Sequence, residues 1–151
     1  MIEKDYMISE LQKLIDFVGE PVEVHIGVQG EPFLYADLIP LISDLEDDDR
    51  ITIISMDTNF TLVTKKMIEK LSKFKKLRLN ISLDALDEKL AEELSGCKYN
   101  LNQVLEMICY AVKKKVRILI APVFLPGYNE KELERIIDFM KELKLKALPK
   151  H

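Results

Sequence analysis

Residues 28–35 read Val-Gln-Gly-Glu-Pro-Phe-Leu-Tyr and connect a stretch with strand-like alternation to a stretch with helical spacing. Pro32 restricts the preceding residue to extended backbone, so this segment should close a strand, turn sharply and open a helix. A Gly-Glu-Pro turn alone is equally well explained by the backbone angles of a strand-to-helix connection. The role of this turn therefore has to be inferred from the rest of the sequence.

Apolar residues on both sides of this turn follow two different periods. We predict strands over residues 22–29, 51–57, 77–83 and 116–125, and helices over residues 7–18, 38–45, 63–74, 87–94, 104–112 and 129–143. Strands that alternate with helices imply right-handed βαβ crossovers and a parallel sheet. The predicted fold class is α/β, either an open doubly wound sheet or an arc of a barrel.

Several helix ends carry recognisable signals. Gly19 should stop the first helix, and Pro40 should fall in the first turn of the second helix or kink it. Asp87 can cap the fourth helix, and Asn129 with Glu132 is a variant of the capping box for the last one. These signals predict where the connections between elements lie.

The composition describes one globular domain. The chain has 151 residues, of which 48% are hydrophobic, enough for one core. Its net charge of -4 gives no general attraction to nucleic acid or anionic membranes. The N-terminus does not resemble a signal peptide, and no apolar run approaches membrane-spanning length. We therefore expect a cytoplasmic protein without a membrane partner, and a nucleic-acid partner is not favoured.

The sequence contains two cysteines, Cys97 and Cys109. Their spacing matches no zinc or iron-sulfur motif, so we interpret them as unpaired structural thiols. No metal ligand is predicted in this chain.

The predicted strands are polar on one face, whereas parallel strands covered on both faces read as continuous apolar runs. The polar positions are Glu23, His25, Gly27, Gln29, Ser55, Asp57, Asn59, Arg78, Asn80, Ser82 and Asp84. Helices that all cover one face require the same-sided winding of a barrel or half-barrel. The polar face then suggests an interior filled by water or ligand, with binding at the carboxyl ends of the strands.

The quoted turn resembles the GGEP motif of radical S-adenosylmethionine (SAM) enzymes, with Gln29 in place of the first Gly. In that family the loop backbone holds the amino group of SAM through carbonyls that are free at the strand end. The resemblance implies that Gly30, Glu31 and Pro32 position SAM, with Glu31 shaping the loop.

Three later segments are similar to the same family. Thr58-Asn59-Phe60-Thr61 looks like its Thr-Asn-Gly-Thr strand end, although Phe60 replaces the usual Gly and puts the turn conformation in question. Residues 79–85 look like the strand in which a Ser and an Asp contact SAM, which implicates Ser82 and Asp84. Residues 121–130 resemble the strand and turn that flank adenine, which implicates Val123. The similarity extends over residues 20–143 and is greatest to archaeal proteins described only as predicted iron-sulfur oxidoreductases.

The Cys-x-x-x-Cys-x-x-Cys motif of that family is missing from this sequence. The motif holds the [4Fe-4S] cluster that delivers the electron for SAM cleavage. We therefore interpret residues 1–151 as a single, incomplete radical SAM core whose cluster loop and first strand lie upstream and whose last strand lies downstream. SAM is the implied cofactor, and the cluster would belong to the complete protein only.

Three functions are compatible with these features. The first is a portion of a radical SAM enzyme that generates a 5'-deoxyadenosyl radical for hydrogen abstraction from an unknown substrate. The second is a non-catalytic α/β module that binds a ligand or a protein. The third is a half-barrel enzyme without SAM that uses Asp57, Asp84 or His25 for acid-base catalysis. No catalytic residue is assigned.

The remaining polar features favour structural roles. His25 should be a hydrogen-bonding strand residue, and Glu23 with Arg78 should form an ion pair near the strand starts. The first predicted strand forms an edge with unpaired backbone groups, so we expect the isolated chain to self-associate through this exposed sheet edge.

Overall fold

The computed structural model describes residues 2–27 and 29–145. Its strands are β1 (Val22–Ile26), β2 (Ile51–Thr58), β3 (Leu77–Ile81) and β4 (Arg117–Ile120). Its helices are α1 (Lys4–Val18), α2 (Leu38–Asp47), α3 (Lys65–Leu71), α4 (Glu88–Ser95), α5 (Leu101–Lys113) and α6 (Glu130–Glu142), with a 3-10 turn, η1 (Pro32–Leu34). Within these described residues, no helix combines the length and apolarity needed to cross a membrane.

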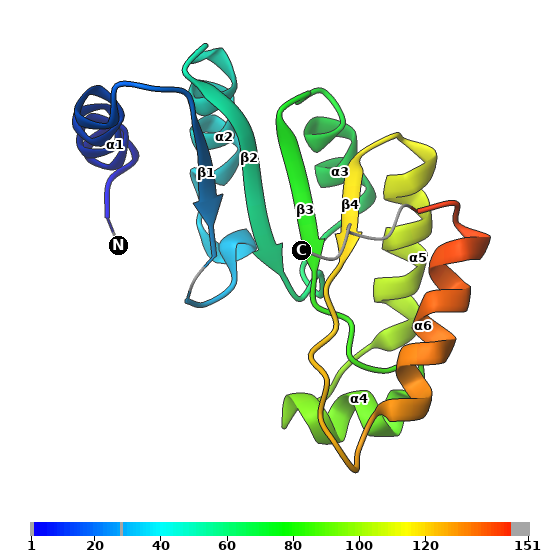
Figure 1. Cartoon of the computed structure of the whole chain (residues 1–151). Coiled ribbons are helices and arrows are strands. Elements are labelled where there is room, and N and C mark those ends of the chain that lie inside the picture. Colours follow the sequence, from blue (N-terminus) through cyan, green and yellow to red (C-terminus); the bar gives the residue numbers. More distant parts are fainter. Residues whose placement is uncertain (1, 28, 146–151) are drawn as a thin grey trace.

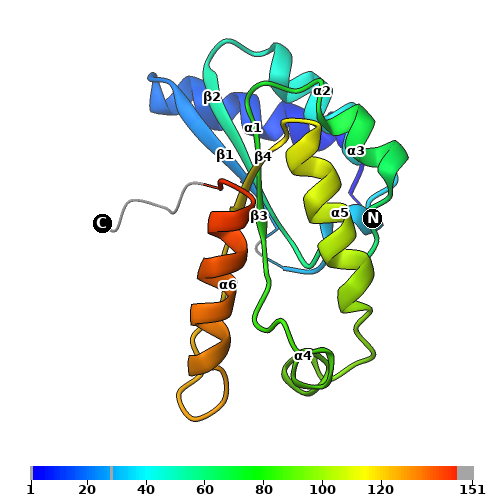
Figure 2. The ribbon, with the colours of Figure 1, turned by 90° about the vertical axis from the view of Figure 1, so that its right-hand side faces the viewer.

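The strands form one parallel sheet in the order β1-β2-β3-β4. Figures 1 and 2 show α2, α3 and α5 on the same face of this sheet. In a doubly wound sheet the strand order reverses and helices cover both faces. Here the strand order does not reverse, and these three helices share one face. The predicted α/β class is confirmed, in its single-wound form, the arc of a barrel.

The core lies between the sheet and these helices. Leu77, Leu79 and Ile81 of β3 are at most 1% exposed, whereas Arg78 and Asn80 between them are partly exposed on the other face. Side chains alternate across a strand, so the covering helices bury one set and leave the other on the open face. The predicted polar face is therefore present.

Three strands are shorter than predicted. β3 ends at Ile81 instead of residue 83. β1 ends at Ile26 instead of residue 29, because Gly27 has φ +109° and leaves extended geometry; Val28 lies outside the described residues. β4 ends at Ile120 instead of residue 125. Pro122 has no N–H for the ladder, and the N–H of Val123 donates to the Asp84 side chain.

Most helix-end signals are confirmed. Gly19 ends α1 in the left-handed conformation at φ +72°, and Pro40 lies in the first turn of α2. The Asp87 side chain caps α4 by accepting from Leu90 N at 2.9 Å. The third helix is shorter than residues 63–74 because Thr64 caps it just before Lys65.

The predicted capping box of the last helix is wrong. Asn129 precedes α6 but makes no side-chain cap, because its amide bonds to Leu125, Asp84 and Val123 instead. Glu132 accepts a hydrogen bond from Leu86 N at 2.5 Å. Asn129 and Glu132 thus bond to other segments of the chain instead of capping the backbone at the start of α6.

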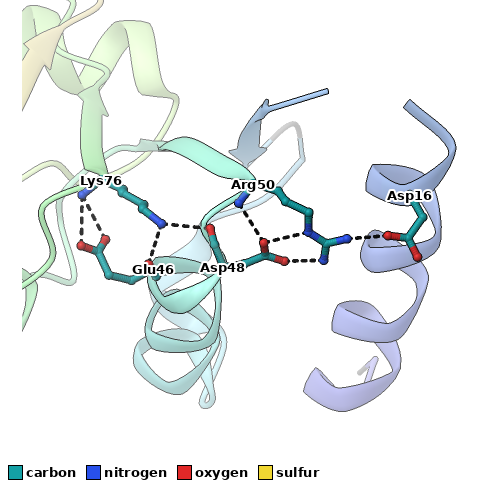
Figure 3. A network of polar contacts seen from close by, with 5 residues as sticks. All are labelled: Asp16, Glu46, Asp48, Arg50 and Lys76. Atoms are coloured by element: carbon teal, nitrogen blue, oxygen red, sulfur yellow. Dashed lines mark hydrogen bonds and ion pairs between the residues drawn. The ribbon is translucent and has the colours of Figure 1, made fainter. Parts of the chain in front are cut away.

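A charged network joins α1 and α2 to the starts of β2 and β3 (Figure 3). Arg50 donates to both carboxylate oxygens of Asp48, at 2.9 and 2.6 Å, and also pairs with Asp16. The Lys76 ammonium donates to the carbonyls of Glu46 and Asp48, at 2.7 and 2.9 Å. Hydrogen bonds from Arg50 lower the pKa of Asp48 to about 2. This network stabilises the amino ends of the strands, opposite the proposed binding edge.

Candidate functional site

The Gly-Glu-Pro turn is attached to the end of β2 by the Glu31 carboxylate. Its Oε1 accepts from the Thr58 hydroxyl at 2.8 Å and from Phe33 N at 3.2 Å, and its Oε2 accepts from Asn59 N at 2.9 Å. Pro32 is buried beside it. Both carboxylate oxygens are thus engaged within the protein, which agrees with the loop-shaping role predicted for Glu31.

Two glycines give this turn its shape for different reasons. A Cβ on Gly27 would lie 2.8 Å from Asp57 O and 3.2 Å from Pro32 Cγ, so the turn packs directly against β2. Gly30 is exposed and has φ +80°, and a Cβ added there would meet nothing within 4 Å. The backbone at Gly30 is therefore open to a ligand.

The segment after β2 contains the predicted Thr-Asn-Phe turn. The Thr58 side chain is buried and accepts from Phe60 N at 2.9 Å. Phe60 has φ +62°, so it keeps the left-handed conformation that a glycine would supply. Its ring is fully buried and packs edge-on against Phe33, with centroids 6.4 Å apart. The replacement of Gly by Phe has preserved the turn.

The ends of β3 and β4 supply the other predicted residues. Ser82 is exposed, and Asp84 is half-buried with its Oδ1 accepting from Val123 N at 2.8 Å. The Val123 side chain is 56% exposed. Tyr99 was not predicted, and its hydroxyl donates to Asn59 O at 3.4 Å. Burial, followed by the charge of Asp84, raises the pKa of Tyr99 to about 12.

The predicted residues therefore lie on one edge of the sheet, at the carboxyl ends of β1 to β4. Gly30, Glu31 and Pro32 follow β1, Thr58 and Asn59 end β2, Ser82 and Asp84 follow β3, and Val123 follows β4. Glu31 is bonded to the end of β2, and Asp84 is bonded to Val123. Ser82 and Gly30 are exposed on this edge.

The open face of the sheet forms a cavity of about 500 Å³. His25 Nδ1 lies 2.9 Å from the Ser55 hydroxyl, and His25 Nε2 lies 3.2 Å from Asp57 Oδ2. Asn80 Nδ2 donates to Asp57 Oδ1 at 2.7 Å. An ionised carboxylate only accepts, so Nε2 of His25 donates to Asp57; in the neutral imidazole, Nδ1 then accepts from Ser55. Donors from His25 and Asn80 thus orient the Asp57 carboxylate within the cavity.

The predicted ion pair at the strand starts is also present. Arg78 donates to Glu23 at 2.7 Å and to Asn80 Oδ1 at 3.3 Å. This pair continues the hydrogen-bonded series from His25 across three strands. Leu119 of β4 and Ala121, which directly follows this strand, complete the wall of the cavity.

The cysteines do not fit an iron-sulfur cluster. Cys97 follows α4 and Cys109 lies within α5, and both are exposed and unpaired. In the part of the chain that the structure describes, no three His, Cys, Asp or Glu side chains gather as metal ligands. A [4Fe-4S] cluster is held by cysteine thiolates, ordinarily four, whereas this sequence has two cysteines on different elements. By contrast, the edge formed by Gly30, Ser82, Asp84 and Val123 offers exposed backbone, hydroxyl and apolar groups and a half-buried carboxylate.

Comparison with known proteins finds one family model, the radical SAM superfamily, which matches residues 3–140. An uncharacterized protein of Methanocaldococcus jannaschii is 36% identical over 149 residues, which cover 96% of this chain and 34% of that protein. A GTP 3',8-cyclase of Staphylococcus aureus is 32% identical over 113 residues, which cover 75% of this chain and 33% of that enzyme. The chain thus spans about a third of the length of these curated relatives.

Solved structures of SAM-bound proteins are also similar to this chain. Streptococcus suis SuiB bound to S-adenosylmethionine aligns with a TM-score of 0.69 and 27% identity, covering 82% of this chain and 28% of SuiB. Native anSMEcpe with bound AdoMet aligns with a TM-score of 0.72 over 97% of this chain and 41% of that one. Its identity is 18%, so it supports the fold alone.

Proposed function

Because this chain belongs to the radical SAM superfamily, we propose that it provides the SAM-binding edge of an enzyme that abstracts hydrogen from its substrate. When bound, SAM and the [4Fe-4S] cluster of this family supply a 5'-deoxyadenosyl radical. The two cysteines do not fit the cluster, so we assign this chain a role in SAM binding only. The observation that carries the proposal is the Glu31 carboxylate, which attaches the Gly-Glu-Pro turn to Thr58 and Asn59.

Each residue of the proposed site has a distinct task. Glu31, Pro32 and Thr58 are buried or internally bonded, and they hold the turn in place. Gly30 presents its backbone to the amino group of SAM, and Asn59 at the end of β2 donates its backbone N–H to the adjacent Glu31. These assignments require the turn to be rigid before the ligand arrives, which lowers the entropic cost of binding.

Ser82, Asp84 and Val123 face the rest of the ligand. Ser82 donates or accepts through its exposed hydroxyl, and Asp84 accepts from ligand hydroxyl groups. Val123 presents an exposed apolar surface that flanks the adenine ring. Burial of this side chain by an aromatic ligand would contribute through the hydrophobic effect.

The substrate is not carried over from the relatives. One relative is named for GTP, and SuiB has been solved with a precursor peptide, so the two point to different substrate classes. We assign substrate contact to the cavity around Asp57, which adjoins the proposed SAM edge along β2.

Calorimetry of SAM binding tests this proposal. We expect the wild-type chain to bind SAM weakly, and we expect Ser82→Ala and Asp84→Ala each to weaken binding by about 1 kcal/mol, roughly fivefold in Kd. Ser95→Ala, which removes an exposed hydroxyl at the end of α4, is the matched control and should leave binding unchanged. Binding that is tight and insensitive to both site variants would contradict the proposed edge.

A second candidate function is supported by the hydrogen bonds of His25. With Ser55 on one ring nitrogen and Asp57 on the other, His25 has the contacts of an oriented acid-base group. This function requires no SAM. If the chain binds no SAM, and ligands of the open face perturb His25 and Asp57, the second candidate replaces the first.

A further inference from the structure

We infer that Asn129 is a positioning residue for the proposed SAM edge. From the start of α6 it holds the β3–α4 loop and the β4–α6 loop in one arrangement, which fixes Asp84 relative to Val123. The inference rests on the proposed function, because Asp84 and Val123 belong to that edge. It assigns a role to a residue whose spacing to Glu132 predicts a helix cap.

The Asn129 side chain is fully buried, and all of its polar groups are used. Its Oδ1 accepts from Leu125 N at 2.8 Å. Its Nδ2 donates to Asp84 O at 3.0 Å and to Val123 O at 2.8 Å. Because the carboxamide has one accepting oxygen and two N–H donors, three backbone groups from two loops are satisfied by one side chain.

A direct bond closes a ring between the same two loops. Asp84 Oδ1 accepts from Val123 N at 2.8 Å, while the carbonyls of both residues accept from Asn129. Each loop is thus bonded to the other directly and through a shared residue. A displacement of either loop breaks bonds in both.

Glu132 extends this arrangement one helical turn further along α6. Its Oε2 accepts from Leu86 N at 2.5 Å, and its Oε1 accepts from Arg135 at 2.5 Å. Arg135 also donates to Leu86 O at 3.5 Å. The β3–α4 loop is therefore held to α6 at Asp84 by Asn129 and at Leu86 by Glu132.

Hydrophobic burial cannot fix the second loop. Val123 is 56% exposed and Phe124 is 54% exposed. The strand ladder cannot fix it either, because β4 ends at Ile120. In Figure 1 the segments that follow β3 and β4 both run toward α4 without regular structure. Val123 is held in place by the hydrogen bond that its N–H donates to Asp84 and by the one that its carbonyl accepts from Asn129.

The inference makes a specific demand on side-chain chemistry. Asn129→Asp would replace the amide nitrogen and its two N–H donors with an accepting oxygen that faces the carbonyls of Asp84 and Val123. Ala would leave both carbonyls and Leu125 N without partners. Neither change touches the proposed ligand contacts, so any loss of SAM binding must act through the two loops.

Amide hydrogen exchange by NMR tests the coupling without any ligand. In Asn129→Ala, we expect Val123 N–H to exchange at least tenfold faster, although its acceptor Asp84 is intact. Sheet amides such as that of Ile81 should be unchanged. Asn100→Ala, which removes the side-chain cap of α5 on Gln103 N, is the matched control and should leave Val123 unaffected. Unchanged protection of Val123 in a folded Asn129→Ala would overturn the inference.

SAM titrations then test positioning by a double-mutant cycle between Asn129→Ala and Asp84→Ala. If Asn129 acts through Asp84, the double variant should bind no more weakly than the weaker single variant. Additive losses, or no loss in Asn129→Ala, would overturn the positioning role. A wild-type chain that binds no SAM, together with faster exchange at Val123 in Asn129→Ala, would refute the proposed function and leave the loop coupling supported.

Glu132→Gln keeps the inference testable if Asn129→Ala does not fold. Its neutral oxygen is a weaker acceptor for Leu86 N, so the Leu86 amide should exchange faster. If the two loops act as one unit, the Val123 amide should also exchange faster. Acceleration at Leu86 alone would contradict the coupling.

Discussion

Phe60 keeps a left-handed backbone at φ +62° although it is a bulky residue at a position where glycine is usual. This conformation costs a non-glycine residue about 1–2 kcal/mol. The ring is fully buried against Phe33, and burial of a phenylalanine side chain contributes about 1.5–3 kcal/mol. Packing therefore offsets the backbone strain, and the turn beside the proposed SAM edge keeps its shape.

Substitutions at Phe60 separate these two effects. We expect Phe60→Ala to lower the free energy of unfolding by about 3–5 kcal/mol, because it leaves a cavity and keeps the strain. Phe60→Gly should be about 1 kcal/mol more stable than Phe60→Ala, the reverse of the usual order, because glycine relieves the strain. Urea denaturation measures both. Phe17→Ala, at a side chain that is 89% exposed, is the control and should change little.

At the scale of elements, local patterns predicted where helices and strands lie but not which tertiary contacts their ends make. Asp87 and Asn129 both precede a helix and have the same capping chemistry. Asp87 caps α4, whereas Asn129 is drawn into bonds with two loops. The spacing of residues along a sequence predicts contacts within one helix. It does not predict the contact of Asn129 with Asp84, which lies 45 residues away in the chain.

For the candidate site too, the sequence predicted which residues share a face but not which contacts they make. Period-two alternation correctly grouped His25, Asp57 and Asn80 on one face of the sheet. It did not reveal that both Glu31 oxygens are used inside the protein, or that Tyr99 reaches Asn59. Those contacts depend on how the ends of neighbouring strands come together in space.

The network that joins α1 and α2 to the sheet predicts acid sensitivity. The pKa of Asp48 is lowered to about 2 from its ordinary value of 3.8, so the folded state favours the charged form. Its contribution to stability is full above pH 3.8 and is lost as the pH falls through about 2. Asp48→Asn should therefore be less stable than wild type at pH 7, and the difference should shrink toward pH 2.

Urea unfolding of both proteins across this pH range is the measurement. Asp49→Asn, a neighbouring exposed carboxylate, serves as the matched control and should differ little from wild type at any pH. A difference between Asp48→Asn and wild type that stays constant down to pH 2 would show that the charge of Asp48 is not involved.

At the scale of the whole molecule, the sheet has an open edge at β1, and α1 carries exposed apolar side chains. Phe17 is 89% exposed, Leu14 is 62% exposed and Tyr6 is 60% exposed. An unpaired strand edge beside an apolar surface favours association between copies. We therefore expect the isolated chain to self-associate as its concentration rises.

Light scattering measures this association. Replacing Phe17 and Leu14 by Ser should reduce the apparent mass at a given concentration, because it removes apolar surface from α1. The paired control replaces Leu62, a side chain that is 42% exposed on the connection before α3, and should have no such effect. A wild-type chain that stays monomeric at high concentration would refute the prediction.

The central claim is that SAM binds at the carboxyl edge of the sheet, between the Gly-Glu-Pro turn and the ends of β3 and β4. The most direct test is to titrate the isotopically labelled chain with SAM and follow its backbone amides by NMR. The account predicts concentration-dependent shifts at Gly30, Ser82, Asp84 and Val123, and none at the Asp48–Arg50 network on the opposite edge. An absence of shifts at saturating SAM, or shifts confined to other surfaces, would contradict it.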